Sequence, residues 1–135
     1  MEDLIALRSI DTNIVVRLLL RDDPKQSALI DALVDQGDLL IPLTVLVETE
    51  WVLRGVYKLD RQTVSNLLFR LTGIEGVNLQ DPPGVRWALE RHATGADLAD
   101  MIHVIASDTD TFLTFDRKLA SGAGDNPRQS VVLVG

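Results

Sequence analysis

The 135-residue sequence contains no cysteine and only two histidines. The absence of cysteine excludes disulfide bonds, thiolate metal ligands and a cysteine nucleophile. Two histidines in the whole chain do not make a zinc site. The sequence also contains no phosphate-cradling P-loop and no G-x-S-x-G nucleophile elbow. Several common kinds of enzyme site are therefore excluded.

Long apolar runs are also absent, and none approaches the ~18 residues that a membrane-spanning helix needs. The chain begins with Glu2 and Asp3 rather than a basic segment, and the apolar "LIAL" that follows is too short for a signal-peptide core. We therefore expect a cytoplasmic protein that does not use a membrane.

Basic residues are outnumbered, with 13 Lys and Arg against 20 Asp and Glu and a formal net charge of −7. This balance argues against a protein that binds nucleic acid by its overall charge. It does not exclude a nuclease, because acids clustered around bound cations are negative only while the site is empty. The chain has no internal repeat and no polar linker, so we predict one domain over residues 1–135.

Short β-like runs alternate with longer helical stretches along the chain. Strands are predicted at "LIALRSI" (4–10), "LLIP" (39–42), "GVNL" (76–79), "TFLTF" (111–115) and "SVVLV" (130–134). Helices are predicted at 13–20, 24–36, 44–57, 60–71, 82–93 and 97–107. This alternation predicts an α/β domain with a mostly parallel sheet. Ligands in such folds bind at the carboxyl ends of the strands.

Asp11 and Asp116 each follow a predicted strand, which places both at a carboxyl edge if the strands are correct. The simplest interpretation is that each caps the next helix, because aspartate is a favoured N-cap. The alternative is that each contributes an oxygen to a cation site.

Glu48 differs from these acids because it lies inside a predicted helix without a basic residue one turn away. An apolar stripe of Val45, Val52 and Val56 predicts that Glu48 flanks the core. Glu50, by contrast, has Arg54 four residues later and is expected to be a surface acid with an ion pair. Since an unpaired carboxylate beside the core is costly, Glu48 is the stronger functional candidate.

The segment "GADLADMIHVIAS" predicts an amphipathic helix that begins at Asp97. Asp97 fits the N-cap, and Asp100 fits the first turn, where acids stabilise a helix. This helix start is also expected to face the carboxyl edge of the sheet. We favour Asp97 as the cap and Asp100 as a ligand.

Four carboxylates brought together would repel one another unless cations compensated them. Oxygen-only donors suit Mg²⁺ or Mn²⁺, and such a site suits phosphodiester hydrolysis. The candidate site residues are the acids Asp11, Glu48, Asp100 and Asp116. Thr12, Asn13 and Thr114 would orient ligands or water around them.

Four segments of the chain together resemble the signature motifs of PIN-domain ribonucleases. They are "IDTNIVVRLL", "VLVETEWVLR", "DLADMIHVIA" and "TFD", in that order. The combination is most similar to the VapC-type toxins of bacterial toxin–antitoxin pairs. The resemblance extends over essentially the whole chain, and each motif alone would be weak.

The resemblance implies a three-layer α/β/α fold and a Mg²⁺- or Mn²⁺-dependent endoribonuclease. It implies a homodimer silenced by a cognate VapB-like antitoxin, with RNA as substrate. Carried over by motif, the acids are again Asp11, Glu48, Asp100 and Asp116. Asp97 also matches an acid of the third motif, so the resemblance leaves open whether Asp97 joins Asp100 as a metal ligand.

Two alternatives remain open on the sequence alone. A phospho-acceptor module of the receiver type is also small, acidic and α/β. It would have to use Asp22, Asp23 and Lys118, but Asp22 and Asp23 precede a predicted helix instead of following a strand. A catalytically silent PIN-like scaffold is the other. For the nuclease, we expect a local basic rim that admits RNA, formed by Arg17, Arg21, Arg54 and Arg117.

Overall fold

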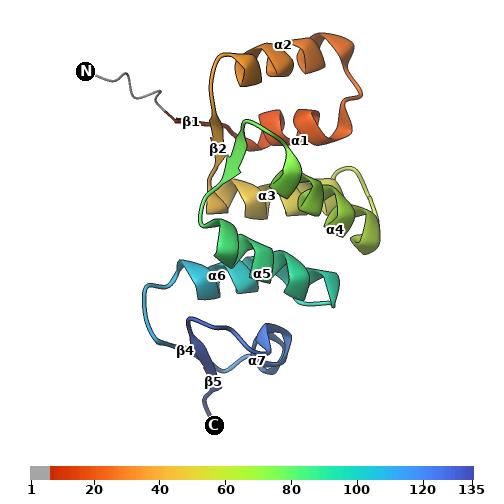
Figure 1. Ribbon diagram of the computed structural model, residues 1–135. Coiled ribbons are helices and arrows are strands. Elements are labelled where there is room, and N and C mark those ends of the chain that lie inside the picture. The colour runs from red at the N-terminus through yellow and green to blue at the C-terminus, as the bar shows by residue number, and fades with distance from the viewer. Residues whose placement is uncertain (1–6) are drawn as a thin grey trace, which may run out of the picture. The chain divides into compact units, whose positions relative to one another are not determined.

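A computed structural model describes residues 7–135, which form two compact units, residues 7–82 and Pro83–Gly135. Both units are built from helices and parallel strands (Figure 1). The predicted α/β class is therefore confirmed, and parallel pairing is consistent with the three-layer fold of the PIN type. Within the described residues, no helix is long and apolar enough to cross a membrane.

The N-terminal unit contains a parallel three-stranded sheet with the order β1-β2-β3. Its strands are β1 (Arg8–Ser9), β2 (Leu39–Ile41) and β3 (Val77–Leu79). Alternate side chains of β2 and β3 are buried, as the period of two in a strand dictates. All three predicted strands are present, although residues 4–6 of the first prediction lie outside the described part of the chain.

Four α-helices complete this unit: α1 (Thr12–Leu20), α2 (Pro24–Asp35), α3 (Leu43–Gly55) and α4 (Arg61–Arg70). A single 3₁₀ turn, η1 (Leu71–Gly73), follows α4. Aspartate side chains cap three of the helices, and Pro24 opens α2 at a position where its missing N–H costs nothing. The predicted helix boundaries are confirmed to within two residues.

Gly76 connects η1 to β3 in a conformation that a side chain would not tolerate. Its φ is +83°, and a Cβ at this position would lie 2.9 Å from Cγ1 of Val34. Glycine therefore allows the chain to enter β3 close to the end of α2.

The C-terminal unit contains α5 (Pro82–Ala93), which begins at the unit boundary, α6 (Leu98–Ala106) and α7 (Arg117–Ala123). Two parallel strands, β4 (Thr111–Thr114) and β5 (Ser130–Leu133), pair with each other. The apolar face predicted for α6 is buried. No helix was predicted over the residues of α7.

The buried face of α3 differs from the predicted one. It consists of Leu46, Thr49, Glu50 and Leu53. Val45 and Val52 are only partly buried and Val56 is exposed, so the Val45–Val52–Val56 stripe does not face the core. The true face follows the helical period but carries two polar side chains, which a search for apolar residues does not detect.

Candidate active site

Asp11 lies two residues beyond β1 and is the N-cap of α1. Its Oδ1 accepts a hydrogen bond from the backbone N–H of Ile14 at 3.2 Å. The capping interpretation is therefore correct. It does not compete with ligand binding, because one carboxylate oxygen is sufficient for the cap. Oδ2 has no hydrogen-bond partner among residues 7–135, and the cap fixes the direction in which it points.

Thr12 links the first and second motifs. Its buried hydroxyl donates a short hydrogen bond to Oε1 of Glu48, which joins the start of α1 to the middle of α3. Glu48 is exposed, whereas the sequence predicted a position on the flank of the core. The Glu48 carboxylate is nevertheless held, because a hydroxyl from a neighbouring helix restricts its rotamers.

Glu50 is the buried acid of α3, where the sequence predicted a surface acid. Only 7% of the residue is exposed, and Nε of Arg54 lies 3.0 Å from its Oε2. The predicted ion pair is confirmed, but it forms at the edge of the core. Because Arg54 compensates Glu50, its burial does not make it a candidate ligand.

Asp97 and Asp100 occupy the start of α6 as predicted. Asp97 is the N-cap, and its Oδ1 accepts a hydrogen bond from the backbone N–H of Asp100 at 3.0 Å. Burial raises the pKa of the Asp100 carboxyl above its ordinary value, and the negative charges of Asp97 and Asp116 raise it further. His103 opposes this shift. The Asp100 carboxylate is therefore poorly compensated.

Asp116 caps α7 in the same way. Its Oδ1 accepts hydrogen bonds from the backbone N–H groups of Lys118 and Leu119 at 2.8 Å and 3.1 Å. The N–H of Asp116 in turn donates to the hydroxyl of Thr114 at 2.9 Å. Thr114 thus fixes the turn that leads from β4 to the acid, as expected of a supporting residue.

A cavity of about 700 Å³ in the C-terminal unit collects the acids of the third and fourth motifs. Three acids and three basic residues line it: Asp97, Asp100, Asp116, Arg91, Arg117 and Lys118. Thr94 to Ala96 and two small residues of α7, Ser121 and Gly122, complete the wall. Asn13, from the first motif, lines a different groove of about 330 Å³ formed by α1 and α2.

The donors fit a hard divalent cation in kind. Carboxylate oxygens are the ligands that Mg²⁺ and Mn²⁺ prefer, and a cation would stabilise the charged form of Asp100, which burial and the neighbouring acids disfavour. Within residues 7–135, no three acidic or histidine side chains are grouped closely enough to enclose a metal ion. Mg²⁺ does not need such a group, because it keeps several waters and commonly binds only one or two carboxylates.

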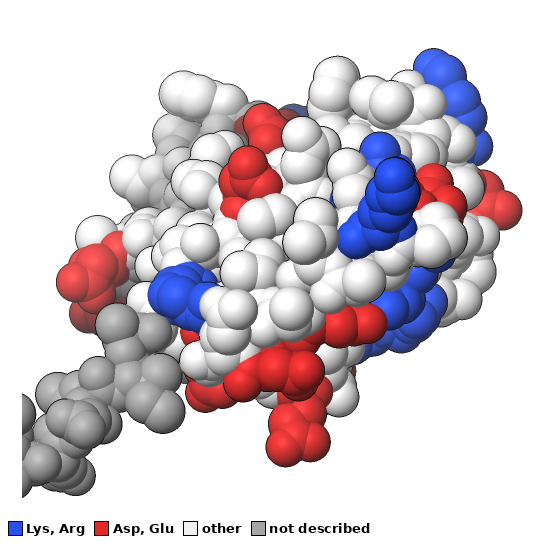
Figure 2. Space-filling view, turned by 90° about the horizontal axis from the view of Figure 1, so that it is seen from above, with Lys and Arg blue, Asp and Glu red and all other residues white. Residues whose placement is uncertain are grey.

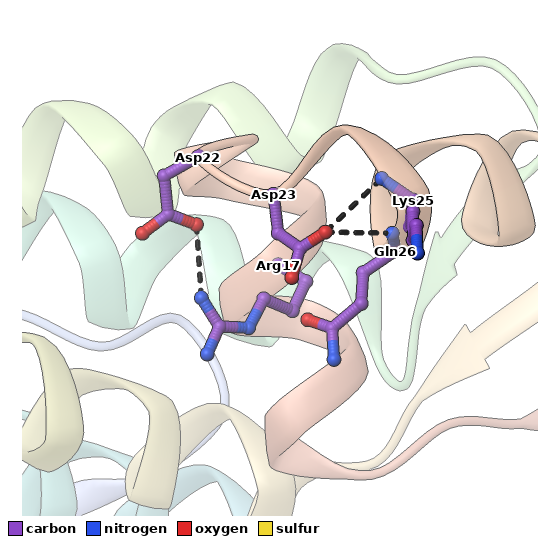
Figure 3. A network of polar contacts seen from close by, with 5 residues as sticks. All are labelled: Arg17, Asp22, Asp23, Lys25 and Gln26. Atoms are coloured by element: carbon purple, nitrogen blue, oxygen red, sulfur yellow. Dashed lines mark hydrogen bonds and ion pairs between the residues drawn. The ribbon is translucent and has the colours of Figure 1, made fainter.

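Three of the four arginines predicted to form a basic rim are engaged in ion pairs. Arg17 pairs with Asp22 at 2.9 Å in the network drawn in Figure 3, and Arg21 pairs with Asp31 at the same distance. Arg54 is held by Glu50. Figure 2 shows both acidic and basic side chains on the face that it draws, among uncharged residues. Of the four residues, Arg117 alone lines the cavity that contains the acids of the C-terminal unit.

Together these features define an α/β protein in which acids at the ends of parallel strands cap the following helices. The chain belongs to the PIN domain family, whose model matches residues 9–124. PIN domains are generally a nuclease fold and are typically metal-dependent. No match was found among curated proteins or among solved structures.

Two basic residues of the cavity were not predicted as part of the nuclease site. Arg91 was not a candidate, and Lys118 was one only for the receiver-type alternative. Arg91 lies near the end of α5, outside all four motifs, and nothing in its local sequence points to the cavity. Lys118 could have been found, since it follows Asp116 by two residues. The receiver-type alternative requires Asp22 and Asp23. Asp22 forms an ion pair with Arg17, and Asp23 caps α2.

Proposed function

We propose that the chain is a Mg²⁺- or Mn²⁺-dependent endoribonuclease that hydrolyses phosphodiester bonds of RNA. The observation that carries the proposal is the PIN family match over residues 9–124, which includes all four predicted acids. Because the match crosses both compact units, we further propose that residues 1–135 act as one PIN domain.

The proposed roles are carried over from the motif resemblance, and the contacts of the neighbouring residues support them. Asp11 and Asp100 would hold the cation, and Glu48 and Asp116 would complete the acidic set and orient the attacking water. Mg²⁺ or Mn²⁺, when bound, supplies charge neutralisation and lowers the pKa of water. The Thr12 hydroxyl orients Glu48, and Thr114 holds the turn at Asp116. Asp97 serves chiefly as the cap of α6.

The biological role that we propose is the toxin of a type II toxin–antitoxin pair. In this role the chain would act in the cytoplasm as a homodimer and would be inhibited by a VapB-like antitoxin. The four motifs support this proposal by their similarity to VapC-type toxins. A short neighbouring reading frame for a DNA-binding antitoxin would be the corresponding genetic observation.

A cleavage assay with purified full-length chain tests the enzymatic proposal. We expect labelled RNA to be cut with Mg²⁺ or Mn²⁺ and to remain intact in EDTA. Asp11→Asn should reduce cleavage by about 10³-fold, because several kcal/mol of transition-state stabilisation would be lost. Asp108→Asn, at an exposed acid after α6, is the matched control and should retain activity. Cleavage that survives both EDTA and Asp11→Asn would contradict the proposal.

A further inference from the structure

The cavity of the C-terminal unit contains more positive charge than an acidic metal site requires. Arg91, Arg117 and Lys118 line it together with the three acids. None of these three basic side chains forms an ion pair within residues 7–135, although the acids share the same cavity. Both kinds of charge are therefore left available to a ligand.

The Arg91 side chain is held in this cavity by the backbone of Gly122 and lies against Gly124. Its Nε–H donates a hydrogen bond to the carbonyl oxygen of Gly122 at 2.9 Å. The guanidinium lies directly over Gly124, where a Cβ would be 2.3 Å from Nη2. Gly124 also has a φ of +55°, so glycine is required there both for the backbone and for the arginine.

The anchoring of Arg91 uses only one of its nitrogens. The Nη1 and Nη2 groups donate no hydrogen bond to any residue in the described part of the chain. A guanidinium held at Nε presents these two groups as a rigid fork, and this fork matches two oxygens of a phosphate. Little conformational entropy remains to be lost when the fork binds its ligand.

We propose that Arg91, assisted by Arg117 and Lys118, forms a subsite for a backbone phosphate of the RNA. The inference rests on the proposed function, because it places this phosphate in the same cavity as Asp100. A chain with a net charge of −7 repels RNA at long range, so local cations beside the acids are needed to receive it. Of the arginines predicted to form a basic rim, the proposed subsite uses only Arg117.

Binding measurements separate the subsite from catalysis. All variants are made in the Asp11→Asn background and titrated with a short, fluorescein-labelled, single-stranded RNA in EDTA at several salt concentrations. Arg91→Gln should weaken binding about tenfold and reduce the magnitude of the salt slope by about one. Arg91→Lys keeps the charge but loses the fork, so its affinity for RNA should lie between that of the parent and that of Arg91→Gln.

Arg86→Gln is the matched control. It removes the same charge from an exposed position of the same helix, α5, outside the cavity. It should leave affinity and salt slope close to those of the parent. Lys118→Gln, at an exposed cavity position, provides a second test that does not depend on the packing around Gly124, and it should weaken binding several-fold.

The outcomes distinguish the two proposals. If wild-type chain cuts RNA but Arg91→Gln and Lys118→Gln bind it as Arg86→Gln does, the subsite is overturned and the nuclease stands. If wild-type chain does not cut RNA but the cavity variants still bind more weakly than the control, the subsite stands and the nuclease fails. A parent chain that binds no RNA overturns the subsite.

Discussion

The acids of the two units are compensated in different ways. In the N-terminal unit, Asp11 accepts a backbone N–H and Glu48 accepts the hydroxyl of Thr12. In the C-terminal unit, the Asp100 side chain accepts no hydrogen bond from the described residues, and its pKa is raised by burial and, next, by the charges of Asp97 and Asp116. Asp97 and Asp116 cap helices as Asp11 does, so among the proposed site acids Asp100 alone accepts no hydrogen bond from a neutral donor in the described residues.

The basic residues show the opposite pattern. In the N-terminal unit, ion pairs with Asp22, Asp31 and Glu50 engage three arginines: Arg17, Arg21 and Arg54. Arg91, Arg117 and Lys118 of the C-terminal unit line a cavity without an ion pair in the described residues. Three arginines of the N-terminal unit are thus engaged in ion pairs, whereas the three basic residues of the cavity in the C-terminal unit are not. Binding of a cation should relieve more repulsion at Asp100 than at Asp11.

Cation-induced stabilisation is the largest effect by which this difference can be tested. Mn²⁺ at a hundredfold excess over its Kd should stabilise the wild-type chain by about 2.7 kcal/mol, because it binds only the folded state. Asp100→Asn should lose most of this gain, and Asp11→Asn should lose a smaller share. Thermal unfolding with and without Mn²⁺ measures the shift for each variant.

Asp108→Asn controls for the removal of one negative charge and should keep the full Mn²⁺ shift. Equal losses in Asp11→Asn and Asp100→Asn would remove the distinction between the two groups of acids. A wild-type chain without any shift would contradict the assignment of these acids as ligands.

The elements around these acids were largely predictable, and the reason is local. Asp60 and Asp97 each precede an amphipathic run, and Pro24 opens another, so caps and periodicity define the helices. The seven-residue α7 escaped prediction because "RKLASGA" contains only one large apolar residue. Its packing comes from Leu119 and Ala123, which are buried by tertiary structure.

Burial on α3 was predicted less well, and the exchange of Glu48 and Glu50 shows why. The buried stripe places Thr49 and Glu50 between Leu46 and Leu53. Because two of the four side chains are polar, the valines on another face gave a stronger apolar signal. Arg54 makes the burial of Glu50 tolerable, but this depends on a geometry that spacing alone does not reveal.

Glu50→Gln should therefore lower stability more than Glu48→Gln does. Loss of the Glu50–Arg54 pair should lower the free energy of unfolding by about 1–2 kcal/mol, less than for a fully buried pair, because the Arg54 side chain is 47% exposed. Glu48→Gln should change stability by less than about 0.5 kcal/mol, since the residue is exposed and glutamine still accepts from Thr12. Urea unfolding measures both.

RNA cleavage provides the complementary measurement for this pair. At a temperature where both variants are folded, Glu50→Gln should retain activity and Glu48→Gln should lose most of it. The reverse result would assign the catalytic role to Glu50. Such a result would contradict the carry-over of the second motif.

The smallest expected effect is the dependence of stability on pH in the absence of metal. Because the folded-state pKa of Asp100 is raised, its contribution to stability is present below the ordinary aspartate pKa of about 3.9 and is lost as pH rises through the raised value. Metal-free Asp100→Asn should therefore be slightly more stable than wild type at neutral pH. The advantage of Asp100→Asn should disappear as pH falls below the ordinary aspartate pKa.

Urea midpoints measured from neutral pH to below the ordinary aspartate pKa, with Asp108→Asn as the control, give the difference in stability. A variant that is less stable at neutral pH and recovers in acid would show that Asp100 is compensated within the unit.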